Sequence, residues 1–432
     1  MTDNTFNEAE LNDISGTDEI VEKIERKKPY QKYIDADLGL RNHWYASFFS
    51  TELEEGKIRG EMICGERIVF KKVDGKVYAL EDRCPHRGAA FTARPECYSK
   101  NSVTCWMHGF TFDVRNGDLI QILSEPESKL IGKMKHATYP VEERNNVVFV
   151  FIGDMAPPPP VEEDIQPKFL KDNLVCHHVA RNRVKGNWRV AAENGYDAAH
   201  LYAHRNSGMF ELVDVPVPLC TFPSNKNEVT VVDGDKGPWG IVKYDDVNVW
   251  YADVEGNPVT AANVTPGEDY ENWDIVVALY MPCGLEVDYF PVPDVLHFEW
   301  YTPIDENHHI YMIAHAAICE TESDADAFRK RCDEELAPLV WRQDSGQKEP
   351  VGDGQNWGFN NFDAWGREQI HHVYQYENFW HRERLFRPDY VVIRWRMLVA
   401  KRMRGKQEWG DWAPVQGWSP DGKNYDPALG PV

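Results

Sequence analysis

Two short segments constrain this chain more than any other feature of its sequence. The first contains Cys84 and His86, and the second contains Cys105 and His108. Eighteen residues separate His86 from Cys105. Each segment pairs a thiol, which binds metals as the thiolate, with an imidazole, which is the commonest metal ligand in proteins. The pattern predicts a metal site built from two loops that the fold must hold side by side.

The order of the ligands indicates which metal group this site holds. Structural zinc sites usually place two cysteines in one segment and two histidines in the other, which is not the order here. A Rieske-type [2Fe–2S] cluster has two thiolates on one iron and two histidines on the other. We therefore expect Cys84 and Cys105 to bind one iron, and His86 and His108 to bind the other.

Two neighbouring positions separate this pattern from the respiratory type of Rieske protein. That type carries two further cysteines, which form a disulfide beneath the cluster. The matching positions here are Ala89 and Met107. The pattern therefore favours the oxygenase branch of these proteins.

A second motif carries the ligands for a single metal ion. His200 and His204 are four residues apart, so on a helix they would share one face. Asn194 and Asp197 lie on roughly the same face. The residues from 187 to 204 read as one helix, and two histidines on one face can bind one metal side by side.

A carboxylate would complete the set of two histidines and one acid that holds oxygen-activating Fe(II). Asp363 lies on a stretch that reads as a helix with an aromatic face, near residues 360–375. Glu368 and Asp353 are rivals for the same role. Spacing alone leaves the choice among these three acids open.

The remaining pattern predicts the fold class. Residues 45–155 read as short strands, with hairpin turns at Asp74-Gly75 and Asn116-Gly117. After the proline run at 156–160, successive long strands separated by turns predict an antiparallel sheet, followed by helices near 323–342 and 360–375. We expect an α+β protein whose helices cover the sheet. The expected parts are an N-terminal arm (1–40), a small all-β [2Fe–2S] domain (41–156) and a catalytic mononuclear iron domain (157–432).

Composition excludes several classes of partner. The 432 residues carry a net charge of −23, which argues against binding nucleic acid or an anionic membrane surface. No run of eighteen apolar residues predicts a membrane span, and the acidic N-terminus does not resemble a secretory signal. Nine scattered cysteines do not form a disulfide framework. We expect a cytoplasmic protein.

Together these motifs resemble the Rieske non-haem iron ring-hydroxylating oxygenases, specifically their terminal oxygenase (alpha) component. The likeness runs from about Tyr30 to Arg404. It is strongest with the type that acts on carbazole (carbazole 1,9a-dioxygenase) or 2-oxoquinoline (2-oxoquinoline 8-monooxygenase). The segments that carry it are residues 41–45, 193–195 and 358–363.

The resemblance implies roles for particular residues. It favours Asp363 as the third iron ligand. It also implies a ring of three subunits, in which His108 of one copy meets Asp197 of the next and Asp197 links the cluster to the iron. Met107 stands where most relatives have tyrosine, and a thioether cannot donate a hydrogen bond to the cluster.

The function we expect is hydroxylation of an aromatic, N-heteroaromatic substrate by mono- or dioxygenation with O2. Electrons would come from NAD(P)H through a reductase, a ferredoxin or both. Candidates for the substrate pocket are Asn194, Gly195, Phe359 and Phe362, because aromatic walls suit a flat ligand and a glycine lets a ligand approach the backbone. Two alternatives are a Rieske monooxygenase that demethylates a small substrate and a non-catalytic carrier of hydrophobic ligands.

Overall fold

The computed structural model describes residues 28–197, 199–204, 217–220, 229–244, 250–252, 258–259, 276–342 and 357–410. The first 27 residues of the expected arm (1–40) lie outside these ranges, as do residues 343–356. Within them the chain is α+β, as the sequence predicts.

The N-terminal β region, residues 43–152, contains three small antiparallel sheets, in the strand orders β1-β10-β9, β2-β3-β4-β8 and β5-β6-β7. Both predicted hairpins are present: Asp74-Gly75 joins β3 to β4, and Asn116-Gly117 lies between β6 and β7. The strands of this region are β1 (His43–Phe49), β2 (Ile58–Ile63), β3 (Glu66–Val73), β4 (Lys76–Glu81), β5 (Ser102–Thr104), β6 (Phe110–Asp113), β7 (Leu119–Ile122), β8 (Thr138–Tyr139), β9 (Val141–Arg144) and β10 (Val147–Ile152).

The second region is built on a seven-stranded sheet in the order β11-β20-β19-β18-β17-β14-β13, and every neighbouring pair in it is antiparallel. A separate three-stranded sheet has the order β12-β15-β16. The strands are β11 (Leu174–Lys185), β12 (Val217–Cys220), β13 (Val229–Val232), β14 (Gly240–Tyr244), β15 (Trp250–Ala252), β16 (Pro258–Val259), β17 (Val276–Tyr280), β18 (Gly284–Asp288), β19 (Leu296–Pro303) and β20 (His308–Ile318).

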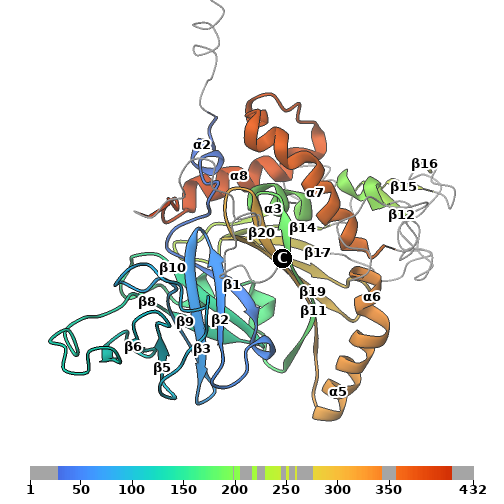
Figure 1. Ribbon diagram of the computed structural model, residues 1–432. Coiled ribbons are helices and arrows are strands. Elements are labelled where there is room, and N and C mark those ends of the chain that lie inside the picture. Colours follow the sequence, from blue (N-terminus) through green and yellow to red (C-terminus); the bar gives the residue numbers. More distant parts are fainter. Residues whose placement is uncertain are drawn as a thin grey trace, which may run out of the picture.

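Helices α3, α7 and α8 lie together on one side of this sheet, and α5 and α6 lie beside its β11 edge (Figure 1). The predicted helices near 323–342 and 360–375 are confirmed. The α-helices are α2 (Gln31–Ile34), α3 (Trp188–Tyr196), α5 (Glu322–Arg331), α6 (Ala337–Val340), α7 (Phe359–Tyr376) and α8 (Tyr390–Arg402). The shorter turns are η2 (Ser50–Glu52), η3 (Val161–Glu163), η4 (Pro167–Leu170), η5 (Ala199–His204), the π-helix η8 (Cys332–Leu336), η9 (Phe379–His381) and η10 (Arg387–Asp389).

The single helix expected over residues 187–204 is wrong. Helix α3 begins after Asn187, whose side chain accepts a hydrogen bond from Arg189 N, and it ends at Tyr196. Asp197 leaves the helix in an extended conformation, and the histidines lie on the separate 3-10 turn η5. The change of direction at Asp197 is what turns both imidazoles towards α7.

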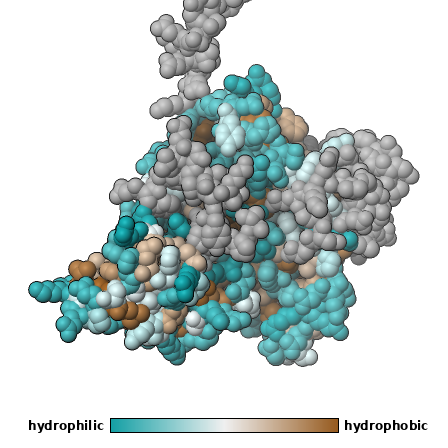
Figure 2. All heavy atoms as spheres, viewed as in Figure 1, coloured by the Kyte–Doolittle hydropathy of each residue, from teal (hydrophilic) through white to brown (hydrophobic). Residues whose placement is uncertain are grey.

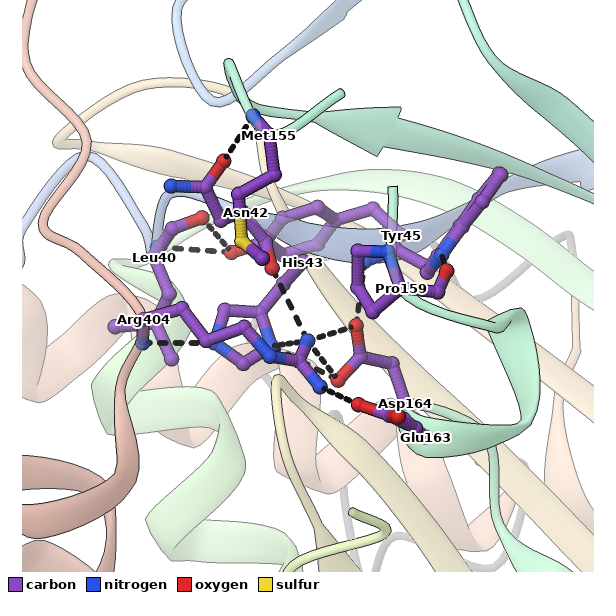
Figure 3. Close-up of polar contacts among 10 residues, drawn as sticks. Leu40, Asn42, His43, Tyr45, Met155, Pro159, Glu163, Asp164 and Arg404 are labelled. Atoms are coloured by element: carbon purple, nitrogen blue, oxygen red, sulfur yellow. Dashed lines mark hydrogen bonds and ion pairs between the residues drawn. The ribbon is translucent and has the colours of Figure 1, made fainter. Parts of the chain in front are cut away.

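A buried polar network joins the two regions (Figure 3). Asp164, which follows the proline run, accepts hydrogen bonds from His43 Nδ1 at 2.9 Å and from Trp44 N at 2.9 Å, both on β1. Arg404, which follows α8, donates to both oxygens of Asp164 at 2.9 and 2.8 Å, and to Glu163 at 2.7 Å. Since His43 and Asp164 are fully buried, this network ties the start of the β region to the end of the second region.

The described surface in Figure 2 is mostly hydrophilic, but hydrophobic residues gather over the part of the β region that holds β5 and β6. The exposed apolar side chains in this part of the sequence include Met107, Ile120, Leu123 and Leu130. Among the residues that the structure describes, no helix has the length and apolar character needed to cross a membrane.

Candidate iron–sulfur and iron sites

Two loops of similar design carry the predicted cluster ligands. The first loop follows β4, and the second lies between β5 and β6. In the first, Gly88 N donates to Cys84 O at 2.8 Å, and in the second, Gly109 N donates to Cys105 O at 2.8 Å. Both glycines have positive φ, +78° and +72°, a conformation that side chains disfavour. The glycine after each ligand pair therefore allows the sharp turn that presents it.

The loops bring like ligands together. The two thiols influence each other: the side chain of Cys84 lowers the pKa of Cys105 to about 6, and that of Cys105 raises the pKa of Cys84. The rings of His86 and His108 lie 4.6 Å apart between centroids. His86 is exposed and also stacks on Phe110, whereas His108 is half-buried.

The chemistry of these four side chains fits a Rieske cluster. Two thiols lie together and two imidazoles lie together, as one iron with two thiolates and one with two histidines require. Nδ1 of His108 is buried and has no hydrogen-bond partner among the described residues. A buried nitrogen without a partner is costly, and a metal bond would satisfy it.

The second site joins η5 to α7. Nε2 of His200 and Nε2 of His204 each lie 3.3 Å from the same oxygen, Oδ1 of Asp363. The three ligand atoms lie within 4.8 Å of one another. His204 and Asp363 are buried, and His200 is nearly so. Ligand atoms about 2.1 Å from one metal ion and at right angles around it are about 3 Å apart, so this geometry fits a metal ion.

The surroundings of Asp363 and His204 favour the ionised carboxylate and the neutral imidazole that a metal needs, whereas those of His200 do not. Burial alone would raise the pKa of Asp363, but the two histidines hold it well below the usual value. Burial lowers the pKa of His204. Burial also acts to lower the pKa of His200, but Asp363 and Asp197 outweigh it and raise that pKa.

Asp197 orients His200 through its main chain. The carbonyl oxygen of Asp197 binds Nδ1 of His200, which leaves the lone pair of Nε2 facing Asp363. The carboxylate Oδ1 of Asp197 accepts a hydrogen bond from Ala199 N at 2.8 Å and so shapes the start of η5. The contact between Asp197 and His200 therefore runs through the main-chain carbonyl of Asp197.

Comparison with known proteins identifies the family. Residues 43–140 match the Rieske [2Fe-2S] domain, and residues 151–407 match a family described as homotrimeric ring hydroxylases. The terminal oxygenase component of carbazole 1,9a-dioxygenase from a Sphingomonas species is 37% identical over 387 residues, which cover 89% of this chain and 97% of that protein. The chain is a Rieske ring-hydroxylating oxygenase.

Other matches agree. The corresponding component from Metapseudomonas resinovorans is 35% identical and covers 89% of this chain and 96% of its own length. The solved structure of the terminal oxygenase of carbazole 1,9a-dioxygenase from Novosphingobium sp. KA1 superposes with a TM-score of 0.78 at 33% identity, covering 90% of this chain and all of that one (100%). The predicted family, fold class and enzyme class are confirmed.

Membership of this family confirms both predicted cofactors, a [2Fe–2S] cluster and a mononuclear non-haem iron. It also excludes the alternative that the chain is a non-catalytic carrier of hydrophobic ligands. The demethylase alternative has weaker support, because a vanillate O-demethylase subunit from a Pseudomonas strain is 28% identical over only 41% of this chain and 49% of its own.

The four candidate pocket residues of this Rieske oxygenase differ in whether they lie beside the iron site. Phe359 stacks on His204 with ring centroids 3.7 Å apart, and Phe362 meets the same ring edge-on at 5.9 Å. Asn194 instead binds Arg367, whose Nε donates to its Oδ1 at 2.6 Å. The interpretation of Gly195 was wrong: a Cβ there would lie 1.9 Å from the hydroxyl oxygen of Tyr301, so a protein side chain fills the space expected for a ligand.

The two rivals of Asp363 differ in position. Glu368 lies on the same helix but faces Lys185, whose Nζ is 3.6 Å from Oε1. Asp353 lies outside the described residues. Within the part of the chain that the structure describes, the three residues His200, His204 and Asp363 are the only acid, histidine or cysteine group that could hold one metal ion.

The sequence did not single out the polar residues beneath the iron site. Glu299 and Arg367 are both buried, at 3% and 1% exposure, and both are linked to residues around Asp363. A signal was present in β19, where His297, Glu299 and Tyr301 alternate and therefore share one face. Polar residues on one face of a buried strand indicate a network of hydrogen bonds.

Proposed function

We propose that this chain is the terminal oxygenase of a multicomponent system that hydroxylates a planar, nitrogen-bearing aromatic substrate. The observation that carries the proposal is the convergence of His200, His204 and Asp363 in a chain that also presents the paired cluster loops. The substrate class is supported by the two curated relatives at 37% and 35% identity, both named as carbazole 1,9a-dioxygenase components.

The proposed ligands are Cys84, Cys105, His86 and His108 for the cluster, and His200, His204 and Asp363 for the iron. When bound, the cluster would supply one-electron transfer, and the iron would supply the binding and activation of O2. The protein's own part is to hold the three side chains together, and their surroundings favour neutral His204 and ionised Asp363.

Aromatic side chains control what reaches this site. Phe359 covers one face of the His204 ring, and Phe290 contacts Phe359 with centroids 5.1 Å apart. Trp357 packs on Phe362 at 5.0 Å. These rings form an apolar wall beside the ligands, which excludes water and suits a flat aromatic molecule. They are the reason to expect an aromatic substrate rather than a small charged one.

The proposed assembly is a homotrimer supplied with electrons by a ferredoxin, a reductase or both. The matching family is described as homotrimeric, and one similar structure is a complex of the oxygenase and the ferredoxin of carbazole 1,9a-dioxygenase. In the trimer, His108 of one copy would donate a hydrogen bond to Asp197 of a neighbouring copy. A cytoplasmic location, where thiols stay reduced, remains a prediction.

A substrate panel with a reconstituted electron-donor chain tests the proposal. Carbazole and 2-oxoquinoline are expected to yield hydroxylated products. Product must be scored directly, because uncoupled turnover also consumes O2. Hydroxylation or demethylation of a methoxybenzoate or a small aliphatic amine, with no product from fused aromatics, would overturn the substrate class and leave the metal sites standing.

A further inference from the structure

Glu299, in the middle of β19, is a buried carboxylate with four hydrogen-bond partners. Nε2 of His297 lies 2.8 Å from Oε1, and Asn360 Nδ2 donates to the same oxygen at 2.7 Å. The hydroxyls of Tyr311, at 2.8 Å, and Tyr301 donate to Oε2. An ionised carboxylate can accept about four such bonds, so the acceptor capacity of Glu299 is filled.

Arg367 balances the charge of Glu299 through two aromatic rings. Its guanidinium carbon lies 4.3 Å from the ring centroid of Tyr311 and 4.9 Å from that of Tyr301. The hydroxyls of these same rings donate to Glu299, so the two tyrosines contact both the cation and the anion. Buried charges are stable only when they are compensated, and this arrangement supplies the compensation.

The same network reaches α7, which carries Asp363, and α3, which precedes the histidine-bearing turn η5. Asn360 and Arg367 belong to α7 and flank Asp363, three residues before it and four after it. On the other side, Arg367 Nε binds Asn194 of α3, the helix that leads into η5. The hydroxyl of Tyr301 also packs against Gly195 of α3. Glu299 therefore lies where the sheet meets helices α3 and α7.

We propose that Glu299 is a positioning residue for the mononuclear iron site. It fixes α7 through Asn360 and α3 through Tyr301, and so sets the placement of Asp363 relative to the two histidines. The inference rests on the proposed ligand set, in which Asp363 binds the iron.

The substitution Glu299→Gln tests this positioning role. The amide removes the negative charge, and its nitrogen cannot accept the hydrogen bonds that one carboxylate oxygen accepts. Loss of a residue that orients metal ligands typically weakens metal binding by about 10- to 100-fold, which is the effect we expect here.

Glu286→Gln is a matched control. Glu286 is also a buried carboxylate, 2% exposed, on the neighbouring strand β18 of the same sheet. It pairs with Lys168, whose Nζ lies 3.0 Å from Oε1, and not with any residue of the iron site. Its substitution removes a buried charge from the same sheet, and we expect it to leave Fe(II) affinity within about threefold of the parent.

The experiment measures Fe(II) affinity in the purified protein after its mononuclear metal has been removed and its cluster retained. Fe(II) is titrated with nitric oxide as the spectroscopic probe, and thermal unfolding is recorded for each variant. Asn360→Ala, which removes the hydrogen bonds from α7 to Glu299 and to the hydroxyl of Tyr311, is the second variant and should weaken Fe(II) binding by a smaller factor. If Glu299→Gln fails to fold, Asn360→Ala still tests the proposal.

Weaker Fe(II) binding by Glu299→Gln and Asn360→Ala, but not by Glu286→Gln, supports the proposal. Unchanged affinity in both site variants overturns it, and so does an equal loss in all three, which would reflect general destabilisation. Asp363→Ala separates this inference from the ligand assignment. If that variant keeps its iron, the ligand set is wrong; if it loses iron while the Glu299 and Asn360 variants do not, only the positioning role fails.

Discussion

The two metal sites of this Rieske oxygenase are built in opposite ways. The cluster loops are local: each consists of one thiol, one imidazole and one glycine within five residues, closed by one hydrogen bond from the glycine to the cysteine. The iron site joins η5 to a helix 159 residues further along the chain, and a buried network holds the two together. One site is exposed at His86, whereas the other is buried.

This difference shows what each site depends on. The cluster loops need only correct turns and a small hydrophobic core beneath them, which includes Phe91, Phe112 and Leu119. The iron site needs the correct packing of α3 and α7 on the sheet. A substitution in one site should therefore leave the other site intact.

Asp363→Ala should have the largest effect. It removes the only carboxylate that faces both histidines among the described residues, so mononuclear iron and product formation should be lost. The cluster absorption and its electron paramagnetic resonance signal should persist, since its ligands lie on other elements. Unchanged turnover would reject the assignment and return attention to Glu368.

Asp197→Asn should slow electron delivery without removing either metal. The amide oxygen can still accept from Ala199 N, and the carbonyl contact with His200 is retained, so η5 keeps its shape. The lost negative charge weakens the proposed link to His108 of a neighbouring copy, and we expect reoxidation of the reduced cluster to be about 10- to 100-fold slower. Parental reoxidation in a rapid single-turnover experiment would count against the link.

Gly109→Ala should damage the cluster loop and spare the iron site. A Cβ there would lie 2.5 Å from the Cβ of Leu123, in addition to about 1–2 kcal/mol of strain from positive φ. Gly88→Ala is the matched control, because it has a similar φ but its Cβ would meet only Arg83 Cγ, at 4.0 Å. Sulfide content should fall further in the Gly109 variant than in the Gly88 variant. Equal losses would show that the backbone strain common to both variants, and not the contact with Leu123, causes the loss of the cluster.

His315→Phe should change only the pH dependence of stability. Burial, with smaller contributions from His297 and His177, holds the pKa of His315 well below its usual value. As pH falls below about 6.5 the unfolded chain binds a proton that the folded chain does not, which costs up to about 1.4 kcal/mol per pH unit.

The free energy of unfolding of the parent should therefore drop between pH 7 and pH 5, and that of the variant should drop less. The variant loses no hydrogen bond, since neither ring nitrogen has a partner among the described residues. Denaturant unfolding at the two pH values measures this, and an identical drop in both proteins would contradict it. Part of the drop should remain, because burial also lowers the pKa of His309 to about 3 and that of His371 to about 4.

The contrast between the sites also explains how much could be predicted from sequence. The Rieske domain could be predicted from sequence, because the residues of each loop motif are neighbours in the chain. The histidine pair was proposed on the assumption of one helix. In the structure the helix ends at Tyr196, and both histidines lie on the separate turn η5. Spacing did not select Asp363 over Glu368, because the direction of each side chain depends on how α7 packs.

Glu299 lay beyond sequence reasoning for a related reason. Its place beneath the iron depends on the register between β19 and β20, which sets Tyr301 opposite Tyr311. Its charge is balanced by Arg367, 68 residues further along the chain. Neither relation can be read from local pattern, and Gly195 was misread because its neighbour, Tyr301, comes from the same distant strand.

The most direct test of the account is the iron and acid-labile sulfide content of the purified chain and of Asp363→Ala. Two separate sites predict about three irons and about two sulfides per chain, falling to about two irons with unchanged sulfide in the variant. A third iron retained in Asp363→Ala, or a parent protein that binds only about two irons when fully reconstituted, would contradict the account.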